Sequence, residues 1–150
     1  MFGDELLFEV PEKDMSLPLH RHIGALLFKK DVEGRKSYGK GSGILISPNL
    51  VLTAAHNLCL QTTREEYHHL RFYPGHSGDM HDCYNISSVF IPPRYFLTNK
   101  PKHDFALLKL DRNVETNDFI PLCTNLQGIN EIEKIAIYGY PADSYTKWGP

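Results

Sequence analysis

The chain has 150 residues, of which 41% are hydrophobic and 23% are charged, as in ordinary globular domains. This length allows one domain with a hydrophobic core, or one small domain and part of another. The 16 basic and 18 acidic residues give a net charge of −2, and no basic stripe follows the sequence. We therefore expect no nucleic-acid partner.

The first residues do not have the pattern of a secretory signal. Asp4, Glu5 and Glu9 stand where a positive start and a long apolar run would be needed. We expect that either the protein is not secreted or its true N-terminus precedes this sequence, so the compartment stays open. The longest uncharged window, 41–63, contains a Ser-Pro-Asn turn and several polar residues. It predicts two strands rather than a membrane span.

Short apolar runs separated by Gly, Pro and Asn predict strands along most of the chain. The expected strands are Ile23–Lys29, Gly43–Ile46, Leu50–Thr53, Leu70–Tyr73, Ile86–Ile91, Phe105–Leu110 and Lys134–Tyr138. Ser47-Pro48-Asn49 predicts a hairpin turn between the second and third of these, because Pro presets the backbone of a turn and Asn tolerates it. One short helix is expected at Thr62–Leu70, with a threonine cap and acidic residues in its first turn.

The domain organisation follows from this pattern. We expect an N-terminal extension over residues 1–22, an all-β, six-stranded antiparallel barrel over residues 23–115, and a linker with the start of an incomplete second barrel over residues 116–150. The boundary is placed at the polar stretch Val114–Pro121, which follows the strongest predicted strand.

The three cysteines, Cys59, Cys83 and Cys123, are too few and too widely spaced to form a disulfide framework. One bridge with a free thiol, or three thiols, both fit. A histidine-bearing stretch could suggest zinc, but its spacing matches no closed zinc pattern, and we expect neither metal nor cofactor. It contains His68, His69, His76, His81 and Cys83. Asn85–Ser87 fits a glycosylation acceptor, which matters only in a secreted protein.

His56 and Asp104 are the candidate catalytic residues. A hydroxyl nucleophile needs an adjacent base at neutral pH, and histidine suits that role. The imidazole must be held in one tautomer, which a carboxylate on its other nitrogen achieves. His56 follows a predicted strand and two alanines, and Asp104 stands at the start of an apolar strand, where its side chain is expected to be largely buried. Each residue alone is ordinary, but their surroundings and order together favour the catalytic hypothesis.

Thr53–His56 resembles the histidine motif of chymotrypsin-like serine proteases, and Asp104–Leu110 resembles their aspartate motif. Histidine before aspartate is the order of that family. Gly139-Tyr140-Pro141, followed by Trp148, is similar to the segment that opens the second barrel in the glutamyl-endopeptidase (V8-like) branch. The resemblance covers roughly residues 23–150.

Two departures qualify the resemblance. Digestive members pair a cysteine after the histidine with one before it, whereas Asn57 and Gly41 occupy those places here, which favours the disulfide-poor branch. Ile23 follows an arginine and a histidine, but it lies too close to His56 for the activation terminus of the family. We therefore predict that Ile23 begins the first barrel strand.

The resemblance implies peptide-bond hydrolysis of a protein or peptide substrate through an acyl-enzyme, without a cofactor. His56 would be general base and then general acid, and Asp104 would orient it. The family's nucleophile stands in a Gly-x-Ser-Gly-type motif several dozen residues after Gly-Tyr-Pro, and we recognise no such motif anywhere in this chain. Ser42 and Ser144 lack that setting and are rejected, so this chain alone is expected to be inactive. The alternative is a non-catalytic homologue that binds a protein or peptide.

Overall fold

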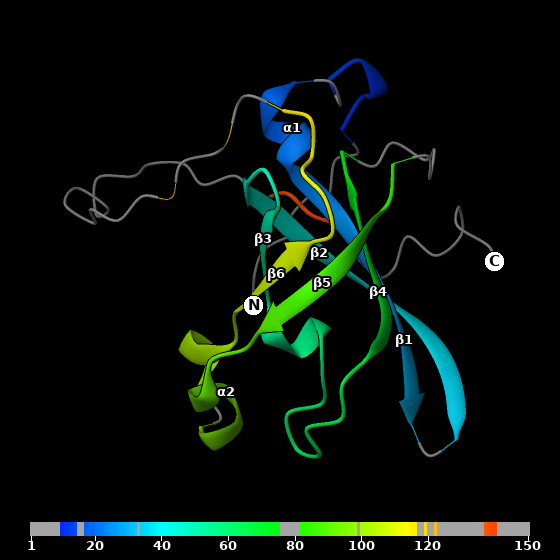
Figure 1. The fold of residues 1–150 in the computed structure, drawn as a ribbon, viewed down its shortest axis with the longest axis vertical. Helices are drawn as coiled ribbons and strands as arrows, with labels where there is room; N and C mark the ends of the chain where they lie inside the picture. The colour runs from blue at the N-terminus through cyan, green and yellow to red at the C-terminus, as the bar shows by residue number, and fades with distance from the viewer. Residues whose placement is uncertain are drawn as a thin grey trace, which may run out of the picture.

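The computed structural model describes residues 10–14, 17–32, 34–75, 82–98, 100–116, 119, 122 and 137–140. Six strands form a closed barrel in the order β1-β2-β3-β6-β5-β4, with every neighbouring pair antiparallel (Figure 1). The strands are β1 (Ile23–Val32), β2 (Arg35–Ser47), β3 (Leu50–Thr53), β4 (His68–Pro74), β5 (Tyr84–Phe90) and β6 (Ala106–Leu110). The expected all-β class with a six-stranded barrel is confirmed.

Short helices occupy the connections between strands. The α-helices are α1 (Pro18–His22) and α2 (Pro93–Leu97), and the 3-10 helices are η1 (Glu12–Asp14), η2 (Ala55–Asn57) and η3 (Pro101–His103). Figure 1 shows α1 at one end of the barrel and α2 at the other. Both α-helices have five residues and begin with proline, which suits the first helical position. They were not expected from the sequence.

The barrel interior is filled by side chains that alternate along the strands. In β6, Ala106, Leu108 and Leu110 are buried, and in β3 Val51 and Thr53 are buried. This period of two brings one face of each strand into the core. The other large, fully buried side chains include Leu26, Leu45, Leu58 and Phe72.

The strands of the barrel lie where the sequence predicted them, but most of them begin or end at other residues. Leu50–Thr53 matches β3 at both ends, and Ile23 begins β1 as expected. The largest difference is in β2, which begins at Arg35, eight residues before the predicted Gly43. Its added residues are mostly polar and do not alternate in hydrophobicity, so the pattern could not reveal them. The predicted strand Lys134–Tyr138 lies mostly outside the described residues.

The helix expected at Thr62–Leu70 is wrong. The chain instead makes a tight loop that is closed by an isolated antiparallel β-bridge between the backbones of Cys59 and Glu66. Within it, Arg64 adopts a left-handed conformation with φ 57°. Tyr67 explains the difference, because it is buried and stacks on Phe28 at a centroid distance of 5.0 Å. Burial of this ring favours the loop over the local preference for helix.

Three further expectations concern cysteines, metal and membrane. Cys59 and Cys83 are both free thiols, consistent with the absence of a disulfide framework, whereas Cys123 lies outside the described residues. Within the described ranges, no group of three or more His, Cys, Asp and Glu residues could hold a metal ion. His76 and His81 lie outside the described ranges. No helix in those ranges is long and apolar enough to cross a membrane.

Candidate active site

The pairing of β3 with β6 brings His56 and Asp104 together. Thr53, the last residue of β3, pairs with Ala106, the first residue of β6. His56 lies three residues beyond the end of β3, in η2, and Asp104 lies two residues before the start of β6. Because the strands are antiparallel, both residues leave the sheet at the same edge. His56 and Asp104 are thus in direct contact although they are 48 residues apart in the sequence.

Two hydrogen bonds connect the residues. His56 Nδ1 lies 2.6 Å from Asp104 Oδ2, and the backbone N–H of His56 donates to Asp104 Oδ1 at 2.9 Å. The expected contact is therefore present. Among the described residues, the Nε2 atom of His56 has no hydrogen-bond partner, and 63% of the His56 side chain is exposed. The ring is held on one side and open on the other.

Asp104 is less buried than the sequence predicted. Its side chain is 29% exposed, because it sits at the rim of the barrel beyond the end of the β3–β6 pairing. Burial alone would raise the pKa of Asp104. Hydrogen bonds from the side chain and backbone of His56 and from the backbone of Ala55 outweigh that effect, so the pKa is lowered from its ordinary value of 3.8. Asp104 is therefore a carboxylate near neutral pH.

A chain of buried hydrogen bonds holds the His56 segment on the barrel. Asn57 Nδ2 donates to Thr53 Oγ1 at 3.1 Å, and Thr53 Oγ1 donates to the carbonyl oxygen of Ser42 at 2.8 Å. Asn57 packs so closely on Gly41 that a Cβ atom there would lie 2.6 Å from the Asn57 side chain. Asn57 and Gly41 were noted in the sequence only for lacking cysteines. The sequence shows only that an amide follows the histidine; its burial and its supporting role are seen in the structure.

Gln61 joins the two halves of the site. It follows η2 closely in the chain, and its Nε2 atom donates to the carbonyl oxygens of Tyr95 and Thr98, at 2.5 and 3.0 Å. Those carbonyls belong to α2 and its C-terminal end, shortly before Asp104. The contact ties the segment that follows His56 to the one that precedes Asp104, and nothing in the sequence pattern pointed to it.

None of the described serine hydroxyls contacts His56. Ser42 Oγ instead accepts a hydrogen bond from the backbone N–H of Tyr140 at 2.8 Å, and Ser144 lies outside the described residues. One upstream tetrapeptide, Gly75–Gly78 (Gly-His-Ser-Gly), does match Gly-x-Ser-Gly and was overlooked in the sequence. Gly75 hydrogen-bonds the carbonyl of Ile23, where β1 begins and β4 ends. Ser77 itself lies outside the described residues.

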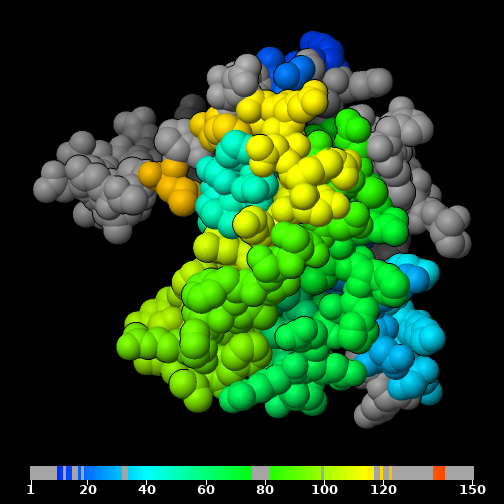
Figure 2. Space-filling view, in the orientation of Figure 1, coloured from blue at the N-terminus to red at the C-terminus, as the bar shows by residue number. Residues whose placement is uncertain are grey.

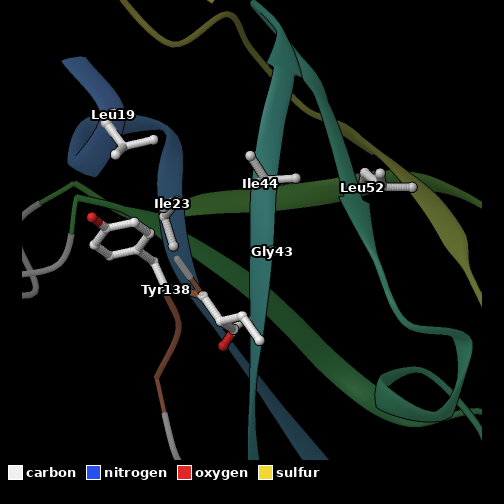
Figure 3. Close-up of a pocket in the computed structure, with 8 residues that line it drawn as sticks. Leu19, Ile23, Gly43, Ile44, Leu52 and Tyr138 are labelled. Atoms are coloured by element: carbon white, nitrogen blue, oxygen red, sulfur yellow. The ribbon is translucent and has the colours of Figure 1, made fainter. Parts of the chain in front are cut away.

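An apolar groove of about 560 Å³ lies beside the site rather than on it. Figure 3 shows Leu19 of α1, Ile23 of β1, Ile44 of β2 and Leu52 of β3 around it, with Tyr138 at its edge. Neither His56 nor Asp104 lines this groove. The outer face of β1–β3 is therefore apolar where residues 137–140 lie against it.

Comparisons with known proteins agree with this geometry. The family model described as Trypsin matches residues 27–147. Serine protease 7 of Drosophila melanogaster is 33% identical over 136 residues, which cover 77% of this chain and 34% of that protein. A solved structure of a Glu endopeptidase superposes with a TM-score of 0.55 at 23% identity, over 69% of this chain and 45% of that one. The last comparison concerns the fold alone.

The chain spans about a third of the length of the Drosophila relative that it matches. The family match nevertheless covers most of the 150 residues, including the barrel, His56 and Asp104. The chain belongs to the trypsin family of serine proteases, and its barrel has the chymotrypsin-like fold.

Proposed function

We propose that this chain is the part of a serine-type endopeptidase that supplies its general base and the carboxylate that orients it. The observation that carries the proposal is the 2.6 Å contact between His56 Nδ1 and Asp104 Oδ2, with Nε2 on the exposed side of the ring. A structural ion pair would not need one ring nitrogen left open toward solvent. A catalytic histidine does, because that nitrogen must reach the nucleophile.

The geometry supports a definite division of roles. Asp104 accepts a hydrogen bond from the Nδ1–H group of His56, so the lone pair of Nε2 is free to take the proton of a serine hydroxyl as the serine oxygen attacks the scissile carbonyl carbon. The carboxylate then stabilises the imidazolium. His56 returns the proton to the leaving amine when the peptide C–N bond breaks, which leaves an acyl-enzyme. In the second half, His56 takes a proton from water as the water oxygen attacks the acyl carbon, and returns it to the serine oxygen when the ester C–O bond breaks and the acid is released.

The substrate would be a protein or peptide, and the nucleophile would come from residues that follow position 150 in the full protein. The family places it in a Gly-x-Ser-Gly-type motif after Gly139-Tyr140-Pro141, and no such motif stands between Pro141 and Pro150. The backbone donors for the tetrahedral oxyanion would come from the same region. The 150 residues alone are therefore expected to be inactive.

The test compares the 150-residue chain with a chain extended through the downstream reading frame. Each is treated with a fluorophosphonate reagent and assayed with a general protein substrate. We expect labelling and turnover only in the extended chain, with both lost on His56→Ala. Ser77→Ala and Ser144→Ala, made in both chains, are the matched controls. Labelling of the short chain that disappears with either serine variant would show that the nucleophile had been wrongly assigned.

A non-catalytic homologue that binds a protein or peptide is the second candidate. One observation favours it: none of the described serine hydroxyls is near enough to His56 to form a hydrogen bond. The retained His56–Asp104 contact argues against it, because a binding module has no chemical need for an oriented imidazole. An extended chain that lacks a Gly-x-Ser-Gly motif and resists the reagent would favour this candidate.

A further inference from the structure

The two strands β1 and β2 continue beyond the barrel as a ribbon, which we define as residues 29–40. β4 pairs with β1 no further than Lys29, and β3 pairs with β2 no further than Gly43. Beyond those points no other described strand pairs with the ribbon, and its remaining contacts with the barrel are made by side chains, such as that of Lys30 with the ring of Tyr67. Figure 1 shows it extending past the other strands, and in Figure 2 its cyan atoms form the lower right edge of the molecule.

The ribbon is the most basic part of a chain whose net charge is −2. It has five basic residues and two acidic ones, a local charge of +3 that leaves −5 for the remaining residues. The basic residues are Lys29, Lys30, Arg35, Lys36 and Lys40, and the acidic ones are Asp31 and Glu33. The lysines and arginine come from both strands, so folding gathers a positive surface that the sequence analysis did not recognise.

The strand register places three of the lysines on one face. Tyr38 pairs with Lys29, Lys36 pairs with Asp31, and Lys40 pairs with Leu27. Directly paired residues project to the same side of an antiparallel pair, and Phe28 between them points into the core. The outer face of the ribbon thus presents Lys29, Lys36 and Lys40 together with Asp31. Lys40 is partly buried, and its Nζ atom lies 5.4 Å from the ring centroid of Tyr140. Arg71 of β4 extends this face, because Arg71 pairs with Leu27 and is exposed.

Asp31, opposite Lys36, is the carboxylate that this register places on the same face of the ribbon. Neither of the two ion pairs found in the described part of the chain involves Lys29, Lys36 or Arg35. The Lys29 Nζ atom instead lies 5.3 Å from the ring centroid of Tyr38, a side chain that is 70% exposed. Positive charge and an exposed aromatic ring therefore remain available to a partner on this face.

We propose that the outer face of the ribbon binds an acidic polypeptide segment. Lys36, Tyr38 and Lys40 stand at alternate positions of one strand, about 6.8 Å apart. An extended peptide with acidic residues at every second position presents carboxylates at the same spacing. A nucleic acid is disfavoured, because Asp31 and Glu33 interrupt the positive charge and a single exposed tyrosine offers no series of stacking platforms.

The outer face of the ribbon does not lead to His56. Gly41, the next residue of β2, is buried and packs against the buried Asn57, whereas the outer face continues through Lys40 and Ser42 to Tyr140. The proposal therefore concerns binding alone and does not depend on catalysis.

The test measures binding to the 150-residue chain by fluorescence anisotropy. The probes are a labelled ten-residue peptide of alternating Glu and Ser, its Gln-Ser counterpart, a heparin fragment and a ten-nucleotide single-stranded DNA. We expect the Glu-Ser peptide to bind in 50 mM salt, to weaken in 300 mM salt, and to bind more tightly than any other probe. Failure of the Glu-Ser peptide to bind, or tighter binding of heparin or DNA, would overturn the proposal.

Charge-reversal variants locate the surface. Lys29→Glu with Lys36→Glu should weaken binding of the Glu-Ser peptide by roughly tenfold or more, whereas Arg94→Glu with Lys109→Glu, which makes the same change in net charge elsewhere, should alter it by about twofold or less. Equal losses in the two pairs would mean that only net charge matters and would refute the assignment. Lys29→Gln with Lys36→Gln gives the same comparison if the reversed pair does not fold, as judged by circular dichroism. Because no hydrolysis is measured, an inactive extended chain would count against the proposed function and not against this surface.

Discussion

The β3–β6 corner and the β1–β2 ribbon are both antiparallel two-strand units, but they are stabilised in different ways. In the corner, side chains alternate between the core and the surface, and Val51, Ala106 and Leu108 are completely buried. In the ribbon, Arg35–Tyr38 is exposed at every position. The corner is therefore fixed by packing against the whole barrel, whereas the ribbon beyond Lys29 pairs only with its own partner strand and contacts the barrel through a few side chains, such as Lys30 on Tyr67.

This difference separates the two features of the chain for which we propose a function. The distance between His56 and Asp104 has to be reproduced accurately, and both residues leave strands whose register is set by the core. A surface that attracts an acidic segment through several charges tolerates movement, and the ribbon is exposed enough to carry those charges. Substitutions in the corner should therefore have large effects on chemistry and stability, and those in the ribbon should not.

The largest effect is expected from Asp104→Asn in the extended, active protein. The amide cannot hold His56 in the required tautomer, so kcat should fall by roughly 10⁴-fold. Ser37→Ala, on the exposed ribbon, is the control and should leave kcat unchanged for a neutral peptide. Steady-state kinetics measure both variants. A decrease of less than tenfold in Asp104→Asn would exclude Asp104 from the orienting role.

Stability provides the next comparison. Leu108 is fully buried in β6, and Leu108→Ala should lower the free energy of unfolding by about 2–5 kcal/mol, because it removes apolar contacts and leaves a cavity. Tyr38→Ala in the ribbon should cost less than about 1 kcal/mol, since only the contact with Lys29 is lost. Urea unfolding of both variants measures the difference. Similar losses would mean that the ribbon is part of the cooperative core.

The corner was predictable from sequence and the ribbon was not, for one physical reason. Val51, Leu52, Leu107 and Leu108 show the apolar pattern of buried strands, and the residues that follow or precede them carry the histidine and aspartate motifs. The ribbon faces solvent on most of its surface, so its sequence, Arg-Lys-Ser-Tyr-Gly-Lys from Arg35 to Lys40, has no apolar alternation. Strand formation there depends on pairing with β1, which hydrophobic periodicity does not record.

The supporting contacts of the site were missed for a related reason. Thr53 and Gln61 donate to carbonyl oxygens 11, 34 and 37 residues away in the sequence, and those partners become known only when the barrel is closed. Asn57 donates to Thr53, only four residues away, but hydrophobic periodicity does not record this bond either. The failed helix at Thr62–Leu70 has the same origin, since Tyr67 is buried against Phe28 of another strand. Local propensity describes a segment before these tertiary contacts are made.

A third, smaller effect tests the packing under His56. In Gly41→Ala the new methyl group would lie 2.6 Å from the Asn57 side chain, so we expect a loss of about 1–3 kcal/mol in the free energy of unfolding. The same substitution made in an Asn57→Ala background should cost less, because the obstructing carboxamide is gone. The coupling is measured by a double-mutant cycle in urea. Additive losses would show that Asn57 does not press on Gly41.

The smallest expected effect is the pH dependence of the contact between Asp104 and His56. Burial would raise the pKa of Asp104, but the hydrogen bonds from His56 and Ala55 lower it below 3.8 in the folded chain. The unfolded chain therefore binds a proton more readily at this residue, so the contribution to stability is complete above the ordinary pKa and is lost as the pH falls through the lower, folded value. Because the His56 side chain is 63% exposed, the contribution should be about 1 kcal/mol or less. Urea unfolding of the native sequence and of Asp104→Asn between pH 5 and pH 2.5 measures it. The difference in unfolding free energy between the two should be largest at pH 5 and should shrink below pH 3.8, and a difference that stays constant or grows on acidification would contradict the lowered pKa.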